Sequence, residues 1–161
     1  GLCEKIFENF DERPKSLLYS IAMDSYMFAL PGAGAGDSLE QQVYLATFNT
    51  IRHLAEQGPC VIIGRCADYV LDGTEGLIRV FLYADIKVRE ERVRERNLYA
   101  DKDVLKNIHR IDRERRDYNR YYAGRDWEKP ENYDLLINTT QIGVDGAVQL
   151  IKDYLKMRGL L

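Results

Sequence analysis

The chain has few cysteines and no long apolar run, and each shortage disfavours a class of protein. Its 161 residues contain three cysteines, Cys3, Cys60 and Cys66, with no C-x-x-C pair and no neighbouring histidine cluster. This spacing disfavours a disulfide framework or a metal site. We therefore expect reduced thiols and a cytoplasmic location, and we expect no metal-binding residues. No apolar run approaches the roughly 20 residues of a membrane helix, and no export leader is evident, so we expect no membrane partner.

An excess of positive charge is also lacking. The net charge of −3 and the isoelectric point of about 5.5 argue against nucleic-acid binding through the overall field. Arginine is nevertheless dense between residues 85 and 125, and its planar fork suits phosphate or carboxylate. The arginines of this stretch are Arg89, Arg92, Arg94, Arg96, Arg110, Arg113, Arg115, Arg116, Arg120 and Arg125.

Strand patterns alternate with helix patterns along the chain. A capping box of Ser38 and Gln41 opens a predicted helix that the Gly58–Pro59 pair ends. Apolar runs predict strands, and amphipathic spacing predicts helices after them. The strands are expected at 60–64, 78–83 and 134–138, and the helices at 86–97, 101–122 and 144–157. This order predicts a parallel α/β sheet with ligands at the carboxyl ends of its strands.

Two short segments are candidates for binding an anion. The glycine loop at 29–41, ALPGAGAGDSLEQ, looks like a phosphate loop but has no lysine, and Asp37 is negative where a phosphate would lie. We interpret residues 1–37 as a helical segment and a flexible link. Arg65 follows the first predicted strand in GRCADY, so it would lie at the carboxyl edge of the sheet. There it would either hold an anionic ligand or pair with a nearby carboxylate.

The predicted helix at 101–122 has two contrasting sides. At about 100° per residue, one side gathers apolar residues and the other gathers arginines with one aspartate. The apolar side holds Val104, Ile108, Ile111, Tyr118 and Tyr122, and the charged side holds Arg110, Arg113, Arg116, Asp117 and Arg120. Like charges at this spacing repel, so acidic neighbours or an anionic ligand must compensate them. A salt-bridged surface helix, an anion site and an RNA-binding helix all remain possible interpretations.

Four motifs in order resemble the cytidylate kinase-like family, a branch of the nucleoside monophosphate kinases. They are GPCVIIGRCADYVL, RVFLYADIKVREERVRER, IDRERRDYNRYYAGRDW and NYDLLINTT, and the resemblance covers about residues 38–157. It implies a three-layer α/β/α fold of the P-loop NTPase type, built as one domain over 1–161 with a lid at about 92–125. It also implies phosphoryl transfer from ATP, with Mg²⁺, to a nucleoside monophosphate or a related acceptor.

The resemblance also implies roles for individual residues. Arg65 matches the arginine that holds the acceptor phosphate, and Arg113 and Asp117 match residues near the acceptor sugar and phosphate. Arg92 matches the catalytic arginine that starts the lid and reaches the donor phosphates, and Arg116 and Arg120 resemble lid arginines that close over the transferring phosphoryl group. Thr139 and Thr140 resemble the loop beside the donor base. The oligomeric state stays open, and the expected partner is a small nucleotide, with no nucleic acid.

This chain departs from the family pattern at two places. Cys66 stands where cytidylate kinases carry an aspartate that contacts cytosine, so the acceptor could be another monophosphate. No G-x-x-x-x-G-K-[ST] motif occurs in the 161 residues, so we expect the first strand and the phosphate loop to lie upstream of Gly1. The alternative is a non-catalytic module that binds nucleotides or anions and has kept only the acceptor site.

Overall fold

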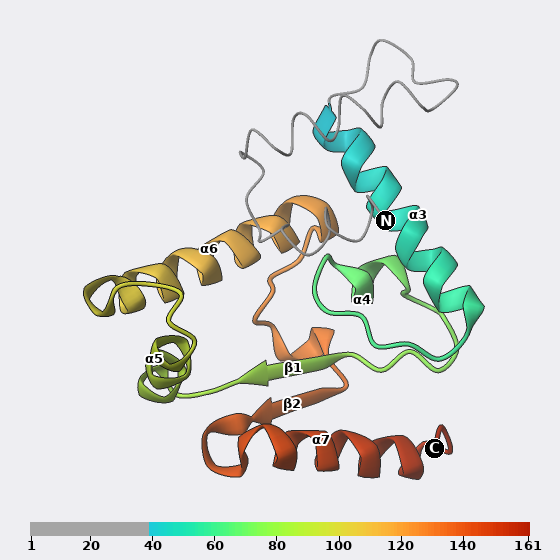
Figure 1. The fold of residues 1–161 in the computed structure, drawn as a ribbon. Coiled ribbons are helices and arrows are strands. Elements are labelled where there is room, and N and C mark those ends of the chain that lie inside the picture. The colour runs from blue at the N-terminus through green and yellow to red at the C-terminus, as the bar shows by residue number, and fades with distance from the viewer. Residues whose placement is uncertain (1–38) are drawn as a thin grey trace. The chain divides into compact units, whose positions relative to one another are not determined.

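The chain divides into two compact units, Gly1–Leu71 and Asp72–Leu161, and each is described by itself. The computed structural model describes residues 39–161, with side chains from residue 44 onward (Figure 1). The glycine loop up to residue 38 and the Ser38 cap lie outside the described residues, so both interpretations stay predictions. The expectation of a single domain over 1–161 also stays a prediction.

The described part of the first unit contains one long helix and one short one. Helix α3 spans Leu39–Gln57, which confirms the predicted helix, and it ends before Gly58, whose φ is +146°. Within α3, the rings of Tyr44 and Phe48 meet edge to face at 5.8 Å. A second helix that the sequence reading did not predict, α4, spans Ala67–Val70. It is a single turn, and it buries Ala67 and Val70.

The predicted strand at 60–64 is wrong. Residues 60–63 have no regular secondary structure, and Val61 and Ile63 are 92% and 90% exposed. A strand is stabilised by hydrogen bonds to a neighbouring strand, and within residues 39–161 this segment pairs with none. A β-branched apolar run therefore gives the propensity for a strand without producing one.

The second unit is organised around a parallel strand pair. Strands β1, Val80–Tyr83, and β2, Leu135–Asn138, confirm the predictions at 78–83 and 134–138. Their register pairs Val80 with Leu135 and Tyr83 with Asn138. Because parallel strands need a crossover, the segment between them carries helices. The small sheet and the many helices establish an α/β fold, whereas the third layer and an additional first strand remain predictions.

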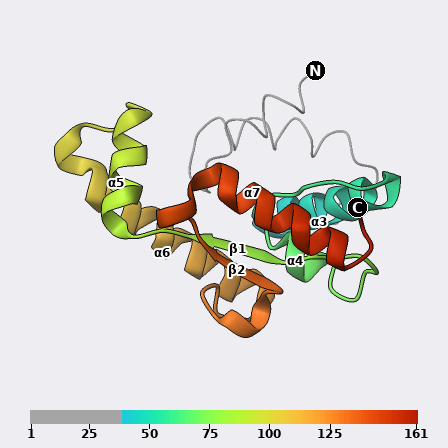
Figure 2. The same cartoon turned by 90° about the horizontal axis from the view of Figure 1, so that it is seen from below.

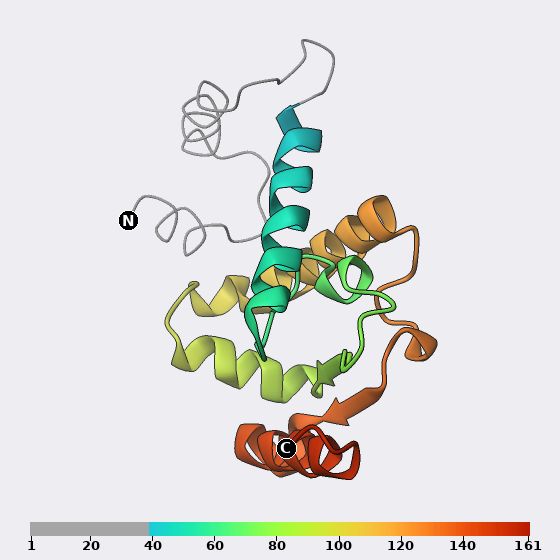
Figure 3. The same ribbon diagram turned by 90° about the vertical axis from the view of Figure 1, so that its right-hand side faces the viewer.

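Helices α5 and α6 form the crossover and lie side by side (Figure 3). Helix α5 spans Ile86–Glu95, and α6 spans Val104–Ala123 after a short 3₁₀ turn, η1, at Asp101–Asp103. Both confirm the predicted helices. Helix α6 ends at Gly124, whose left-handed φ of 65° lets its N–H donate to the Arg120 carbonyl at 3.2 Å. A second 3₁₀ turn, η2 at Pro130–Asn132, leads to β2.

Helix α7, Thr139–Met157, packs along β1 and β2 (Figure 2). It starts five residues before the predicted helix at 144–157 because a first turn precedes a kink at Gly143. The backbone angles of Gly143, φ 67° and ψ −169°, belong to a region that side chains exclude almost completely. The kink places the first turn of α7 directly after the carboxyl end of β2.

Aliphatic residues form the buried core of the second unit, and a cluster of half-buried aromatic rings includes Phe81 of β1. The Phe81 ring of β1 lies 5.2 Å from the Trp127 ring and 4.9 Å from the Tyr133 ring. On α6, Val104 and Ile108 are buried, which confirms the predicted apolar side at its first two positions. Among the helices that the structure describes, none has the length and apolar character to span a bilayer.

Candidate functional site

Arg92 is fixed at the carboxyl edge of the sheet. Thr139 directly follows β2, is buried, and donates its hydroxyl to the Tyr83 carbonyl of β1 at 3.1 Å. The Arg92 guanidinium, from α5, donates one hydrogen bond to Thr139 Oγ1 at 2.8 Å and another to the Thr139 carbonyl at 2.9 Å. Two of the predicted site residues, Arg92 and Thr139, are therefore in direct contact beside the ends of both strands.

Thr140 fastens the same edge. The Asp85 N–H donates to Thr140 Oγ1 at 2.8 Å, which ties the residues after β1 to the start of α7. The Thr140 N–H donates to Asn138 Oδ1 at 2.9 Å, so Asn138 caps α7. Thr139 and Thr140, which were predicted to lie beside the base of the phosphoryl donor, thus hold the strand ends together in this structure.

The partners of Arg92 leave its charge uncompensated. Both of its acceptors belong to Thr139, which is neutral, and the two bonds use only some of the N–H donors of a guanidinium. Within residues 44–161, Arg92 makes no ion pair with a carboxylate. Its side chain is half-buried, so a ligand can reach it. A positioned, half-buried guanidinium with unused donors is suited to binding a phosphate.

A second arginine of α5 joins this helix to α6. Arg89 donates to both carboxylate oxygens of Asp112, at 2.8 Å and 2.7 Å, and the Asp112 side chain is only 11% exposed. In the sequence, Asp112 stands in a run of acids interleaved with arginines. A signal was present, because Val104, Ile108 and Asp112 lie four residues apart in one helical row. A carboxylate in an apolar row needs a buried cationic partner.

Asp112 also faces a third arginine. Arg115 lies one turn further along α6, and its Nη1 is 3.9 Å from Asp112 Oδ1. The Arg115 guanidinium carbon is 5.7 Å from the centroid of the Trp127 ring, which itself packs on Phe81. Asp112 therefore contacts α5 through Arg89 and connects to β1 through Arg115 and Trp127.

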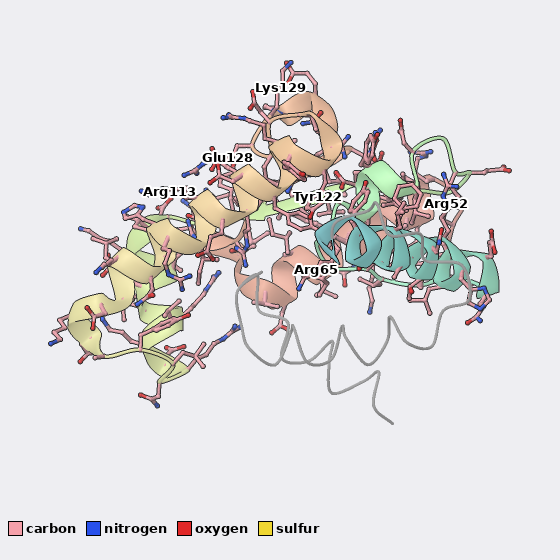
Figure 4. All side chains as sticks on the ribbon, turned by 90° about the horizontal axis from the view of Figure 1, so that it is seen from above. Arg52, Arg65, Arg113, Tyr122, Glu128 and Lys129 are labelled. Atoms are coloured by element: carbon pink, nitrogen blue, oxygen red, sulfur yellow. The ribbon has the colours of Figure 1, made fainter. Side chains whose placement is uncertain are left out.

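The exposed side of α6 carries the remaining predicted arginines. Arg113 and Asp117 are exposed, and neither makes an ion pair in the part of the chain that the structure describes. Figure 4 shows Arg113 on the same side of α6 as Glu128, with Tyr122 on the other. This agrees with the two sides predicted from helical spacing. Arg113 and Asp117 lie together on this surface but do not contact Arg92 directly.

Acidic neighbours compensate two of the predicted lid arginines. Arg116 donates to Glu128 at 2.9 Å, and Arg120 donates to Asp126 at 3.0 Å. Both acids lie in the segment that follows α6. All four side chains are substantially exposed, at 70% for Arg120 and 67% for Asp126. Such pairs contribute little to stability and can exchange for another anion.

Arg65 lies in the first unit, in a left-handed turn. Gly64, Arg65 and Cys66 have φ values of 71°, 56° and 52°, and the Ala67 N–H donates to the Gly64 carbonyl at 3.1 Å. Side chains at positive φ are strained, and such strain gathers at functional positions. Arg65 follows an irregular segment instead of the predicted strand, so its expected place at a strand end is wrong. Cys66 is buried, at 2% exposure.

Titratable groups of the site region show one resolved feature in the first unit. Burial raises the pKa of Tyr44, and the neighbouring Tyr69 and Cys66 raise it further. No group of three or more histidine, cysteine or acidic side chains that could hold a metal occurs within the described residues.

Comparison with known proteins identifies similar chains. The family model described as the cytidylate kinase-like family matches residues 1–141. A cytidylate kinase from Pyrococcus horikoshii is 31% identical over 100 residues, which cover 61% of this chain and 50% of that protein. This chain thus spans about half the length of that relative. A solved structure of an uncharacterized protein from Eubacterium ventriosum is 30% identical, with a TM-score of 0.68, over 73% of this chain and 74% of that one.

Proposed function

The chain belongs to the cytidylate kinase-like family, and on this premise we propose that the whole protein transfers a phosphoryl group from ATP to a nucleoside monophosphate or a related small acceptor. The observation that carries the proposal is Arg92, whose guanidinium is held by neutral oxygens at the carboxyl edge of the sheet. Phosphoryl transfer needs positive charge at a fixed position, because charge accumulates on the equatorial oxygens in the transition state.

The other predicted residues take complementary roles in this proposal. Arg65 would bind the acceptor phosphate, and Arg113 and Asp117 would meet the acceptor sugar and phosphate. Arg116 and Arg120 would leave Glu128 and Asp126 and close over the transferring group. Exposed ion pairs permit this exchange because a phosphate carries more negative charge than a carboxylate. Closure would also exclude water that could otherwise hydrolyse the donor.

The proposal names the phosphoryl donor and the acceptor by their chemical class. Mg²⁺, when bound with ATP, would bridge the donor phosphates and offset their charge. Of the two threonines predicted to contact ATP, Thr140 is the better placed. Its hydroxyl oxygen accepts from the Asp85 N–H and its backbone N–H donates to Asn138, so neither bond uses its hydroxyl hydrogen. Cys66 offers a poor hydrogen-bond partner to cytosine, so we propose an acceptor range that is broader than cytidylate.

A second candidate is a nucleotide-binding or anion-binding module without catalysis. The observation that favours it is the neutralisation of Arg116 and Arg120 by Glu128 and Asp126, which leaves the lid arginines without free charge. In that case Arg65 and Arg92 would each still be able to bind an anion. The two candidates therefore differ in turnover and agree in binding.

Assays of the full-length gene product decide between them. ADP release is measured with ATP, Mg²⁺ and each of CMP, dCMP, UMP, AMP and GMP, and binding of each nucleotide is measured by calorimetry. We expect ADP release that depends on at least one acceptor. Binding of ATP and a monophosphate without ADP release from any combination would overturn the kinase and support the binding module. An RNA-binding role predicts instead an affinity for RNA that falls steeply with salt.

A further inference from the structure

Asp112 is a buried carboxylate to which neither candidate function assigns a role. It receives both hydrogen bonds of a bidentate pair from Arg89 and lies 3.9 Å from a second guanidinium, that of Arg115. A buried ion pair is often no more stabilising than apolar residues of the same volume. Stability alone is therefore a weak explanation for this arrangement. What a bidentate pair does supply is a fixed geometry between the two elements that it joins.

Helix α5 is the element whose geometry matters. Arg89 and Arg92 are three residues apart, so they lie on neighbouring parts of one helical surface. Arg89 holds α5 to α6 through Asp112, and Arg92 holds it to Thr139 at the start of α7. If the first contact is lost, α5 can rotate or shift, and the Arg92 guanidinium moves with it.

The contacts around α5 form a closed series of side-chain contacts that begins and ends on β1. From Phe81 it passes to the Trp127 ring at 5.2 Å, to Arg115 at 5.7 Å, and to Asp112 at 3.9 Å. It continues through the bidentate pair to α5 and returns through Arg92 and Thr139 to the Tyr83 carbonyl. Asp112 is the point at which the two halves of this series meet.

We propose that Asp112 and Arg89 are positioning residues that hold Arg92 at the carboxyl edge of the sheet and set its distance from the arginines of α6. This inference rests on the proposed function, because the geometry matters only if Arg92 and the α6 arginines act on one transferring group. Asp112 itself does not touch substrate. Arg113, the next residue in the chain, is one of those predicted to do so.

The test compares Asp112→Asn with a matched control in the full-length protein. Asp112→Asn keeps the shape of the side chain and removes its charge. The control is Glu114→Gln, because Glu114 accepts from Arg110 at 2.6 Å within α6 and joins no second helix. We expect kcat to fall about 10- to 100-fold in Asp112→Asn, as expected for a displaced catalytic group, with KM for the acceptor nearly unchanged. Glu114→Gln should leave both constants within about twofold of wild type, because this partly exposed pair lies within one helix and holds no other element in place.

A graded pair of substitutions at Arg89 tests position against simple loss of charge. Arg89→Lys keeps a cation that can form one hydrogen bond to Asp112, and Arg89→Ala keeps none. Partial recovery of kcat in Arg89→Lys relative to Arg89→Ala is expected. Equal kcat in wild type and all three variants, with only the melting temperature lowered, would overturn the positioning role. The Arg89 variants also provide the test if Asp112→Asn fails to fold.

Amide hydrogen exchange separates this inference from the proposed function. Exchange within α5, Ile86–Glu95, should accelerate in Asp112→Asn and stay unchanged in Glu114→Gln. Faster exchange in α5 together with an inactive wild-type protein would reject the kinase function and leave the contact as a structural one. Unchanged exchange in α5 would reject the positioning pair, even if the wild-type enzyme transfers phosphate.

Discussion

At the amino ends of β1 and β2 an arginine is paired with a carboxylate, whereas at the carboxyl ends an arginine is held by neutral oxygens. Arg79, just before β1, donates from its N–H to Asp134 Oδ2 at 2.7 Å and from its guanidinium to both oxygens at 3.2 and 3.3 Å. The Asp134 N–H returns a bond to the Arg79 carbonyl at 2.8 Å. Arg92, at the other end, donates within residues 44–161 only to the hydroxyl and the carbonyl of Thr139.

The difference separates an arginine that stabilises the fold from one that can bind a ligand. The charge of Arg79 is neutralised by Asp134, and Asp72 adds a contact at 3.6 Å. The charge of Arg92 is not neutralised within residues 44–161, although its side chain is held as firmly by two hydrogen bonds. Position and free charge together are what a phosphate site requires. An arginine count alone does not distinguish these two cases.

The largest predicted effect breaks the carboxyl end of this comparison. Arg92→Ala in the full-length protein should lower kcat about 10²- to 10³-fold, because a preorganised charge at the transferring group is lost. Arg79→Ala, the matched substitution at the amino end, should leave kcat within about threefold wherever the protein remains folded. Steady-state kinetics of both variants provide the measurement. Similar losses of kcat in the two variants would show that the ends do not differ in role.

The next predicted effect is on stability, and here the amino ends of the strands should matter more than the carboxyl ends. Asp134→Ala should lower the free energy of unfolding by about 1.5 to 3 kcal/mol, because it removes the carboxylate that accepts from the Arg79 guanidinium and N–H. Urea denaturation followed by circular dichroism measures this loss. Thr139→Val removes the hydroxyl that accepts from Arg92 and donates to the Tyr83 carbonyl, but it keeps the volume and the Thr139 carbonyl acceptor of Arg92. It should therefore cost less, about 0.5 to 1.5 kcal/mol. A larger cost at Thr139 would reverse our assignment of the stabilising end.

The two ends should also respond differently to pH. Burial alone would raise the pKa of Asp134, but the hydrogen bonds from Arg79 and the charges of Arg79 and Arg158 outweigh it and lower the pKa. A lowered pKa in the folded state means that the stabilisation is complete above the unfolded value of about 3.9 and is lost as the pH falls through the folded value.

Asp134→Asn therefore tests the sign of this linkage. The difference in free energy of unfolding between wild type and Asp134→Asn should be constant from about pH 7 to about pH 5 and should shrink as the pH falls below about 4. The difference between wild type and Thr139→Val should not change over that range, since a threonine hydroxyl does not titrate. Urea titrations at each pH provide both differences. A stability difference for Asp134→Asn that grows with acidity would contradict the lowered pKa.

Local patterns predicted most of the second unit and its parallel pair. Strands β1 and β2 are continuous apolar runs, and helix α6 buries the first two residues of its predicted apolar side. Helix α5 forms where its pattern predicts it, although none of its residues is fully buried. The strand at 60–64 could not be judged in this way, because a strand depends on hydrogen bonds to another segment. The early start of α7 was missed because Gly143 interrupts the helical backbone and so hides the first turn.

The sequence indicated individual candidate residues of the site but not the contacts between them. Arg92 and Thr139 were both named, but for different parts of a nucleotide, and nothing in a one-dimensional pattern joins residues 47 positions apart. Asp112 lies within a run of alternating charges, where only its four-residue spacing from Val104 and Ile108 distinguishes it from the other charged residues. The charge balance of each arginine depends on such long-range contacts, and this balance distinguishes Arg79 from Arg92.

The smallest predicted effect extends the comparison to the lid arginines, which are neutralised but exposed. Glu128→Gln and Asp126→Asn free Arg116 and Arg120 for a phosphate, so KM for the nucleotide should fall about two- to fivefold, in keeping with the low stability of exposed ion pairs. Glu114→Gln serves as the control, since its partner Arg110 is outside the predicted site. The decrease in KM should become smaller as ionic strength rises, because salt screens exposed charges. If KM rises in both variants, the acids help to hold the arginines in their binding position instead of competing with the nucleotide, and the neutralised arginines then resemble Arg92 more than Arg79.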